Sequence, residues 1–126
     1  MLSRQAQEIL QYAEQTWGHR PDTPWLKYPD NLVLRHPGSR KWYALLMPVA
    51  RCKLGLSGEG SVAVINLKCG AELSGSLRQM AGCFPAYHMN KKLWLTVLLD
   101  GTLPTEEVLQ LVELSFSLTA DKKDIK

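Results

Sequence analysis

The stretch "NLVLRHPGSRKWYALLMPV", residues 31–49, predicts the hairpin around which the sheet is built. Residues 31–36 form a short β-prone run, and the Pro-Gly pair within residues 37–40 favours a tight turn. Residues 41–49 then return as a strand that is apolar on both faces, which is typical of a central strand. Because Pro48 lacks a backbone N–H, we expect it to mark the end of this strand or a bulge.

The segments that follow this hairpin predict further strands and one short helix. Residues 61–69 alternate between two faces and predict a third strand. Residues 71–80 carry apolar side chains at helical spacing and predict a short helix, which Gly75 weakens. We expect residues 81–92 to form a loop and residues 93–99 to form a strand.

Helices are expected near both ends of the chain. Residues 3–17 place apolar side chains on one helical face, and Ser3 is suited to cap that helix. Three prolines in residues 19–30 exclude a continued helix, so an ordered loop is expected there. A final helix is expected to open at Pro104, because two glutamates follow where the helix dipole favours acids.

The order of these elements predicts an α+β fold. Because the connections between neighbouring strands are short, we expect an antiparallel sheet of four or more strands with helices packed on one face. Residues 1–120 are expected to form a single domain, since the chain shows no linker or repeat. Residues 121–126 are expected to be a frayed tail.

The composition indicates a globular protein that does not enter a membrane. Of the 126 residues, 45% are hydrophobic and 21% are charged, which argues against extensive disorder. The longest apolar runs are too short to span a bilayer, and the N-terminal residues do not resemble a signal peptide. The three cysteines, Cys52, Cys69 and Cys83, are odd in number and widely spaced. Reduced thiols and a cytoplasmic location are therefore expected.

No recurrent catalytic or metal-binding motif stands out. The glycines of "GLSGEG", residues 55–60, lack the Lys-Ser/Thr ending of a phosphate loop and favour a turn. Cys69, Cys83 and His88 offer zinc-binding atoms, but their spacing matches no common zinc pattern. We therefore expect no enzyme activity, no catalytic residues, no metal, no cofactor and no small-molecule substrate.

The distribution of charge favours a binding function instead. The net charge is only +3, but residues 31–99 carry nine Lys or Arg against two Asp or Glu. Such segregation predicts a positive face that attracts phosphates, such as those of a nucleic acid. The alternative is a solvated surface whose cations separate when the chain folds. The predicted phosphate-binding residues are Arg35, Arg40, Lys41, Lys68, Arg78, Lys91 and Lys92.

A second notable stretch is "FPAYHMNKKLWLTVLLDG", residues 84–101. It brings together Tyr87, His88, Asn90 and Trp94, which we expect to form a structural motif that locks a loop in place. Asn90 is expected to satisfy backbone groups. The indole of Trp94 is expected to pack in the core and anchor the strand, with base stacking as the alternative.

Several segments together resemble one known family. They are "WLKYPDNLVLRH", "KWYALLM", "INLKC", "SLRQMAGCFPAYHMNKKLW" and "LLDGTLPTEEVLQLVELSFSLT", and they are similar to the MmcQ/YjbR family of small bacterial proteins. This resemblance runs from the first helix to about Leu118. It implies a CyaY-like, or double-wing, α+β fold and a DNA-binding role.

Two other functions compete with DNA binding. The first is a protein-interaction module or homodimer, which would use apolar surface near Trp25 and Tyr28 and bind no nucleic acid. The second is an enzyme, which would require a deep pocket that holds His88 beside a carboxylate or thiol.

Overall fold

The sheet consists of five antiparallel strands in the order β1-β2-β3-β5-β4. The computed structural model describes residues 3–87, 89–122 and 124. As expected, β2 lies inside the sheet, between its hairpin partner β1 and β3. The strands are β1 (Leu32–Arg35), β2 (Trp42–Ala50), β3 (Ser61–Lys68), β4 (Cys83–Pro85) and β5 (Trp94–Leu98).

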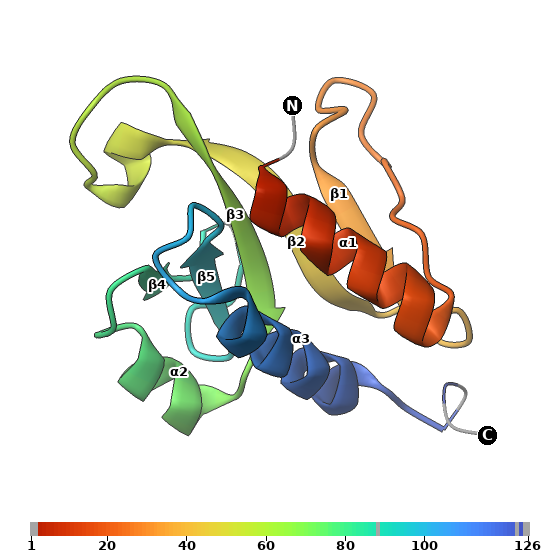
Figure 1. Cartoon of the computed structure of the whole chain (residues 1–126). Helices are drawn as coiled ribbons and strands as arrows, with labels where there is room; N and C mark the ends of the chain where they lie inside the picture. Colours follow the sequence, from red (N-terminus) through yellow and green to blue (C-terminus); the bar gives the residue numbers. More distant parts are fainter. Residues whose placement is uncertain (1–2, 88, 123, 125–126) are drawn as a thin grey trace.

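Two long helices cover one face of this sheet. Helix α1 (Arg4–Trp17) and helix α3 (Thr105–Thr119) lie side by side across it, as Figure 1 shows. The short helix α2 (Ala71–Leu77) packs near the other edge, against β4 and β5. The expected α+β fold, with an antiparallel sheet and helices on one face, is confirmed.

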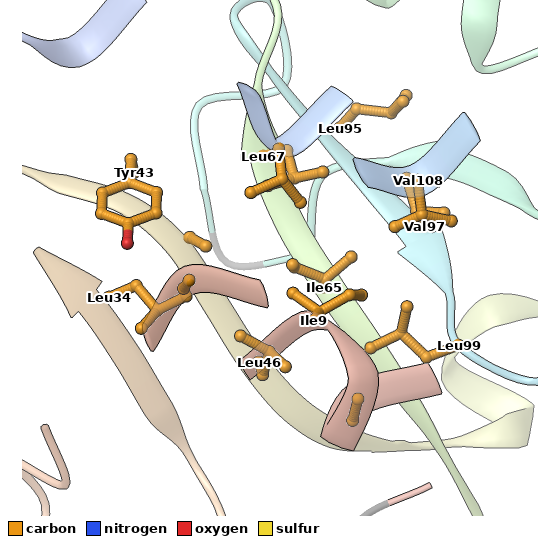
Figure 2. Packing of buried hydrophobic residues seen from close by; sticks show 14 of the residues in the cluster. Ile9, Leu34, Tyr43, Leu46, Ile65, Leu67, Leu95, Val97, Leu99 and Val108 are labelled. Atoms are coloured by element: carbon orange, nitrogen blue, oxygen red, sulfur yellow. The ribbon is translucent and has the colours of Figure 1, made fainter. Parts of the chain in front are cut away.

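Side chains from α1, α3 and the sheet form the main core. Alternate residues of each strand face the helices, as the twofold repeat of a strand requires. Figure 2 shows this packing, in which the apolar side chains of four strands meet those of both helices. The labelled core residues include Ile9, Leu34, Leu46, Ile65, Leu67, Leu95, Val97 and Val108, all of them buried.

Local signals at its N-terminal end hold α1 in place on this core. The Ser3 hydroxyl accepts a hydrogen bond from the Ala6 backbone N–H at 3.2 Å, as expected for an N-cap. The buried Gln5 amide donates to the Leu103 carbonyl at 2.7 Å and accepts from the Gly101 N–H at 2.8 Å. Gln5 therefore ties the start of α1 to the loop that precedes α3.

A β-bulge lies near the start of β2. Leu34 pairs with Ala44, whereas the next residue, Arg35, pairs with Trp42, so Tyr43 is the extra residue of β2. Tyr43 is fully buried in the helix-side core, where Figure 2 shows its ring. The bulge thus lets Tyr43 enter the core while Trp42 stays half-buried at the sheet edge.

Four local predictions were wrong or incomplete. The expected loop over residues 81–92 contains β4, and the expected helix over residues 71–80 ends at Leu77. The Gly-rich connection is preceded by a 3-10 helix, η1 (Arg51–Leu54). Strand β2 continues past Pro48 to Ala50, because β1 pairs no further than Leu46 and no neighbour on that side needs the missing N–H.

Candidate nucleic-acid interface

Four half-buried side chains lie at the same end of four neighbouring strands. Arg35 is the last residue of β1, Trp42 the first of β2, Lys68 the last of β3 and Trp94 the first of β5. Because these strands are antiparallel, the last residues of β1 and β3 and the first residues of β2 and β5 lie at the same end of the sheet. Arg35 pairs with Trp42, and Lys68 pairs with Trp94. We call these four residues the sheet-end band, in which cations and indole rings alternate.

A surface hollow of about 360 Å³ opens beside the band. The start of β2, the end of β3, the start of β5 and the end of α3 all contribute to its wall. The residues that line this sheet-end hollow are Lys41, Trp42, Lys68, Trp94, Leu118 and Thr119.

The cations near this hollow differ in how far they are neutralised. Arg35 contacts the Asp22 carboxylate at 2.7 Å, and Arg40 approaches the same carboxylate at 3.6 Å. Lys41 lies 3.3 Å from Asp121. Lys68, by contrast, forms no ion pair with any carboxylate of the residues that the structure describes. Lys68 is therefore the cation of the band best placed to attract an anion.

The other predicted cations lie apart from this hollow. The Arg78 guanidinium donates to the Lys91 carbonyl at 2.7 Å, so it braces the turn before β5. Lys91 lines a second hollow, of about 240 Å³, together with Lys53. Lys92 is exposed in the same turn. The structure thus brings Lys41 and Lys68 together, with Arg35 and Arg40 beside them at Asp22, and places Arg78, Lys91 and Lys92 elsewhere.

The predicted structural motif fixes the backbone that leads into β5. The Tyr87 N–H donates to the Thr96 hydroxyl at 2.8 Å, and that hydroxyl donates to the buried Asn66 amide oxygen. Asn90 accepts from the Lys92 N–H through its side chain, at 2.9 Å, and from the Trp94 N–H through its carbonyl, at 2.9 Å. These bonds hold the turn in place. The fourth motif residue, His88, lies outside the described residues.

The expectation that Trp94 packs in the core is wrong. Its neighbours Leu95 and Val97 are buried among the helix-side residues, whereas the Trp94 side chain is half-buried and lines the sheet-end hollow. Its position at the first residue of β5 explains the difference, because the sheet ends there and covers the indole only in part.

An aromatic cluster lies on the helix-covered side of β2. Trp17 stacks on Phe116 with ring centroids 4.1 Å apart, and Tyr43 meets both rings edge-on. The Tyr43 hydroxyl lies 2.9 Å from His19 Nδ1, and burial raises the pKa of this tyrosine. The fully buried His36 packs against the same phenol and phenyl rings.

The hydrogen bonds around His36 indicate which ring nitrogen carries the hydrogen of the neutral imidazole. Thr119 donates its hydroxyl hydrogen to the Ser115 carbonyl at 2.7 Å, so it accepts from His36 Nε2 at 2.9 Å. His36 Nδ1 faces the Asp124 carboxylate at 3.9 Å without a hydrogen bond. Burial lowers the pKa of His36, although Asp124 acts in the opposite direction.

The Asp124 carboxylate also attaches the described part of the C-terminal tail to the turn before β2. It accepts from the Ser39 N–H at 2.9 Å and from the Ser39 hydroxyl at 2.7 Å. Burial would raise the pKa of Asp124, but these bonds and one from the Asp121 N–H lower it. Asp121 thus lies against Lys41, which lines the sheet-end hollow, and Asp124 lies against Ser39.

We expect the free energy of unfolding to fall as the pH drops below about 6.5. Burial lowers the pKa values of His19 and His36 from 6.5 in the folded protein, so only the unfolded chain binds those protons in this range. The lowered pKa of Asp124 acts later, below its ordinary value of 3.8. Urea unfolding at about pH 7.5 and about pH 5.5 tests this, and an unchanged midpoint would contradict it.

The described residues contain no grouping that suggests metal or thiolate chemistry. Among them, no three His, Cys, Asp or Glu side chains converge on a point where an ion could bind. Cys69 and Cys83 are buried, and burial raises the pKa of both thiols, which disfavours reactive thiolates. None of the helices in residues 3–87, 89–122 and 124 has both the length and the apolar character to cross a bilayer.

Sequence reasoning missed three parts of this site. The first is Trp42, which was treated only as a strand residue. It directly follows a lysine at the start of a strand, and Trp94 likewise comes two residues after Lys92. Asp22 and Asp121 come from segments far from the basic middle of the chain, and only the fold brings them to Arg35 and Lys41.

Several known proteins are similar to this chain in sequence or in structure. Uncharacterised protein YyaQ of Bacillus subtilis is 43% identical over 119 residues, which cover 94% of this chain and 99% of YyaQ. Uncharacterised protein YjbR of Escherichia coli is 42% identical over 53 residues, or 41% of this chain and 45% of YjbR. A Pseudomonas syringae crystal structure matches with a TM-score of 0.89 and 48% identity, covering 94% of this chain and 100% of that one. A Deinococcus radiodurans crystal structure matches with a TM-score of 0.70 and 26% identity, covering 93% and 79%. Residues 15–118 match the YjbR family, and the chain therefore belongs to it.

Proposed function

We propose that this protein binds DNA without catalysing a reaction, and that the sheet-end band receives the phosphates. The observation that carries this proposal is Lys68, a half-buried cation at a hollow with no carboxylate partner among the described residues. A lysine ammonium is a compact charge suited to phosphate oxygens.

The neighbouring ion pairs are compatible with this role. The side chains of Lys41 and Asp121 are 57% and 33% exposed, and exposed pairs of this kind contribute only about 0–1 kcal/mol. A phosphate can therefore replace Asp121 as the partner of Lys41 at little cost. Arg35 and Arg40 share a single carboxylate, Asp22, and so keep excess positive charge at the same edge.

Duplex DNA titrated over a salt series tests the proposal. Binding should weaken linearly on a log–log plot, because each neutralised phosphate releases about 0.9 counterion. Replacing Lys68 with alanine should reduce the steepness of that plot by about 0.9. Fluorescence anisotropy of a labelled duplex gives both quantities.

Arg4→Ala is the charge-matched control for Lys68→Ala. Arg4 opens α1 and is 95% exposed, and it lies about 20 Å along the helix from the Trp17 end that contacts Tyr43. This control should keep the wild-type salt dependence. A salt-independent signal, or no binding of the duplex at low salt, would count decisively against duplex DNA as a partner.

One observation favours a second candidate function, a protein-interaction module. In the loop between α1 and β1, Leu26 is 99% exposed and Tyr28 is 60% exposed. Exposed large apolar side chains of this kind are common at protein interfaces. This function would depend on Leu26 rather than on Lys68, so Lys68→Ala would leave such binding intact.

A further inference from the structure

We infer that the sheet-end hollow recognises an unpaired nucleotide, whose base stacks on Trp94 while its phosphate contacts Lys68. This inference rests on the proposed nucleic-acid binding and specifies the strand that is bound. The chemistry is that of single-stranded nucleic acid, which DNA and RNA share.

The backbone of Trp94 is held rigidly on both sides. Its N–H donates to the Asn90 carbonyl at 2.9 Å, and its carbonyl lies 3.3 Å from the Ser74 hydroxyl. Arg78 reinforces the same turn through the Lys91 carbonyl. Because this backbone is already ordered, little backbone freedom is lost when a base stacks on the ring, which favours binding.

The indole of Trp94 is nevertheless only partly covered, and it borders the hollow. Within the part of the chain that the structure describes, no aromatic ring stacks on it and no cation lies over it. It belongs to neither of the two apolar clusters and is half-buried at the hollow. A partly exposed indole that borders a hollow is a suitable platform on which an unpaired base can stack.

Trp42, on the other side of the hollow, is already engaged. The Arg35 guanidinium carbon lies 5.6 Å from its ring centroid, and Trp25 meets it at 85° with centroids 5.6 Å apart. Trp42 therefore forms a firm wall of the hollow rather than a second stacking surface. This difference between the two indoles assigns the base to Trp94.

Lys68 is correctly placed for the phosphate of the same nucleotide. It is the direct cross-strand partner of Trp94, and side chains in such positions start about 5 Å apart. A base on the ring and a phosphate on the ammonium can then be bound together. Bases in a duplex are stacked inside the helix and cannot present a face to Trp94, so unpaired strands are preferred.

The wild-type protein provides the first test. Strands of about 10 nucleotides are titrated at low salt: oligo-dT, oligo-U, an abasic strand with the same phosphates, and a duplex. We expect oligo-dT or oligo-U to bind at least about 10-fold more tightly than the abasic strand, because only those strands carry bases. An oligo-dU strand, which has the same base as oligo-U, then identifies the preferred sugar.

Variants of Trp94 provide the second test. Trp94→Leu should remove the advantage of oligo-dT over the abasic strand, whereas Trp94→Phe, which keeps an aromatic face, should retain most of it. Lys68→Ala should weaken both strands by a similar factor. Tyr28→Leu is the matched control, since Tyr28 is exposed but does not line the hollow. Circular dichroism verifies the fold of each variant.

The possible outcomes separate this inference from the proposed function. Equal affinity for oligo-dT and the abasic strand, or tighter binding of the duplex, would overturn base stacking and leave phosphate binding in place. The absence of binding to every strand would overturn both. If Trp94→Leu loses the preference for oligo-dT over the abasic strand, while Trp94→Phe and Tyr28→Leu keep it, the assignment of the base to this ring is supported.

Discussion

Gly82→Ala is expected to lower the free energy of unfolding by about 2–4 kcal/mol, the sum of a backbone term and a packing term. Gly82 has a φ of +88°, which residues with a Cβ rarely adopt. An added Cβ would lie 2.9 Å from Thr102 Cγ2 and 3.0 Å from Leu103 Cδ1. Leu103 is buried in the core, so this contact cannot relax freely.

Gly75→Ala is the matched control for this substitution, and its effect should have the opposite sign. Gly75 lies within α2, its φ is not positive, and nothing lies within 4 Å of the position a Cβ would take. Alanine should therefore raise the free energy of unfolding by up to about 1 kcal/mol through helix propensity. Urea unfolding of both variants measures the difference. Similar values for the two would show that the close approach of Gly82 to Thr102 has no energetic weight.

Tyr43→Ala is the second substitution with a large expected effect, a destabilisation of about 3–5 kcal/mol. The ring is fully buried, and its centroid lies 5.1 Å from Phe116, 5.2 Å from His36 and 5.6 Å from Trp17. Removing it leaves a cavity at the point where α1, α3 and β2 meet. A loss of this size is a large fraction of the stability of an ordinary domain.

Tyr43→Phe separates the hydroxyl from the ring. This variant keeps the packing and loses only the hydrogen bond to His19, so a loss of about 1 kcal/mol is expected. Chemical denaturation monitored by near-ultraviolet circular dichroism reports on the aromatic cluster directly. Equal losses for Tyr43→Ala and Tyr43→Phe would mean that the hydroxyl, rather than the ring, holds this region together.

The parts of the fold that could be predicted are those with a long periodic pattern. Helix α1 has a clear cap and a helical repeat, and the hairpin of β1 and β2 has a clear turn between two β-prone runs. Strand β4 has three residues and ends in Pro85, so it is too short to show a twofold repeat. The pairing of β3 with β5, across the intervening α2 and β4, depends on tertiary packing that no local pattern records.

The candidate site was less predictable, because its charges depend on distant segments. The basic middle of the chain pointed to Lys41 and Lys68, which do line one hollow. The carboxylates of Asp22 and Asp121, however, approach the cations only through the fold. Trp94 was expected in the core, since burial is the usual state of a strand tryptophan, and its place at the sheet end could not be inferred from alternation alone.

The attachment of Asp124 to Ser39 has a practical consequence for work on the purified protein. Since Asp121 also pairs with Lys41, a purification tag fused behind Asp124 would emerge next to the sheet-end hollow. A polyhistidine sequence there would add its own charge to any ligand titration. A tag fused ahead of α1 would leave from the opposite end of that helix and would keep such measurements clean.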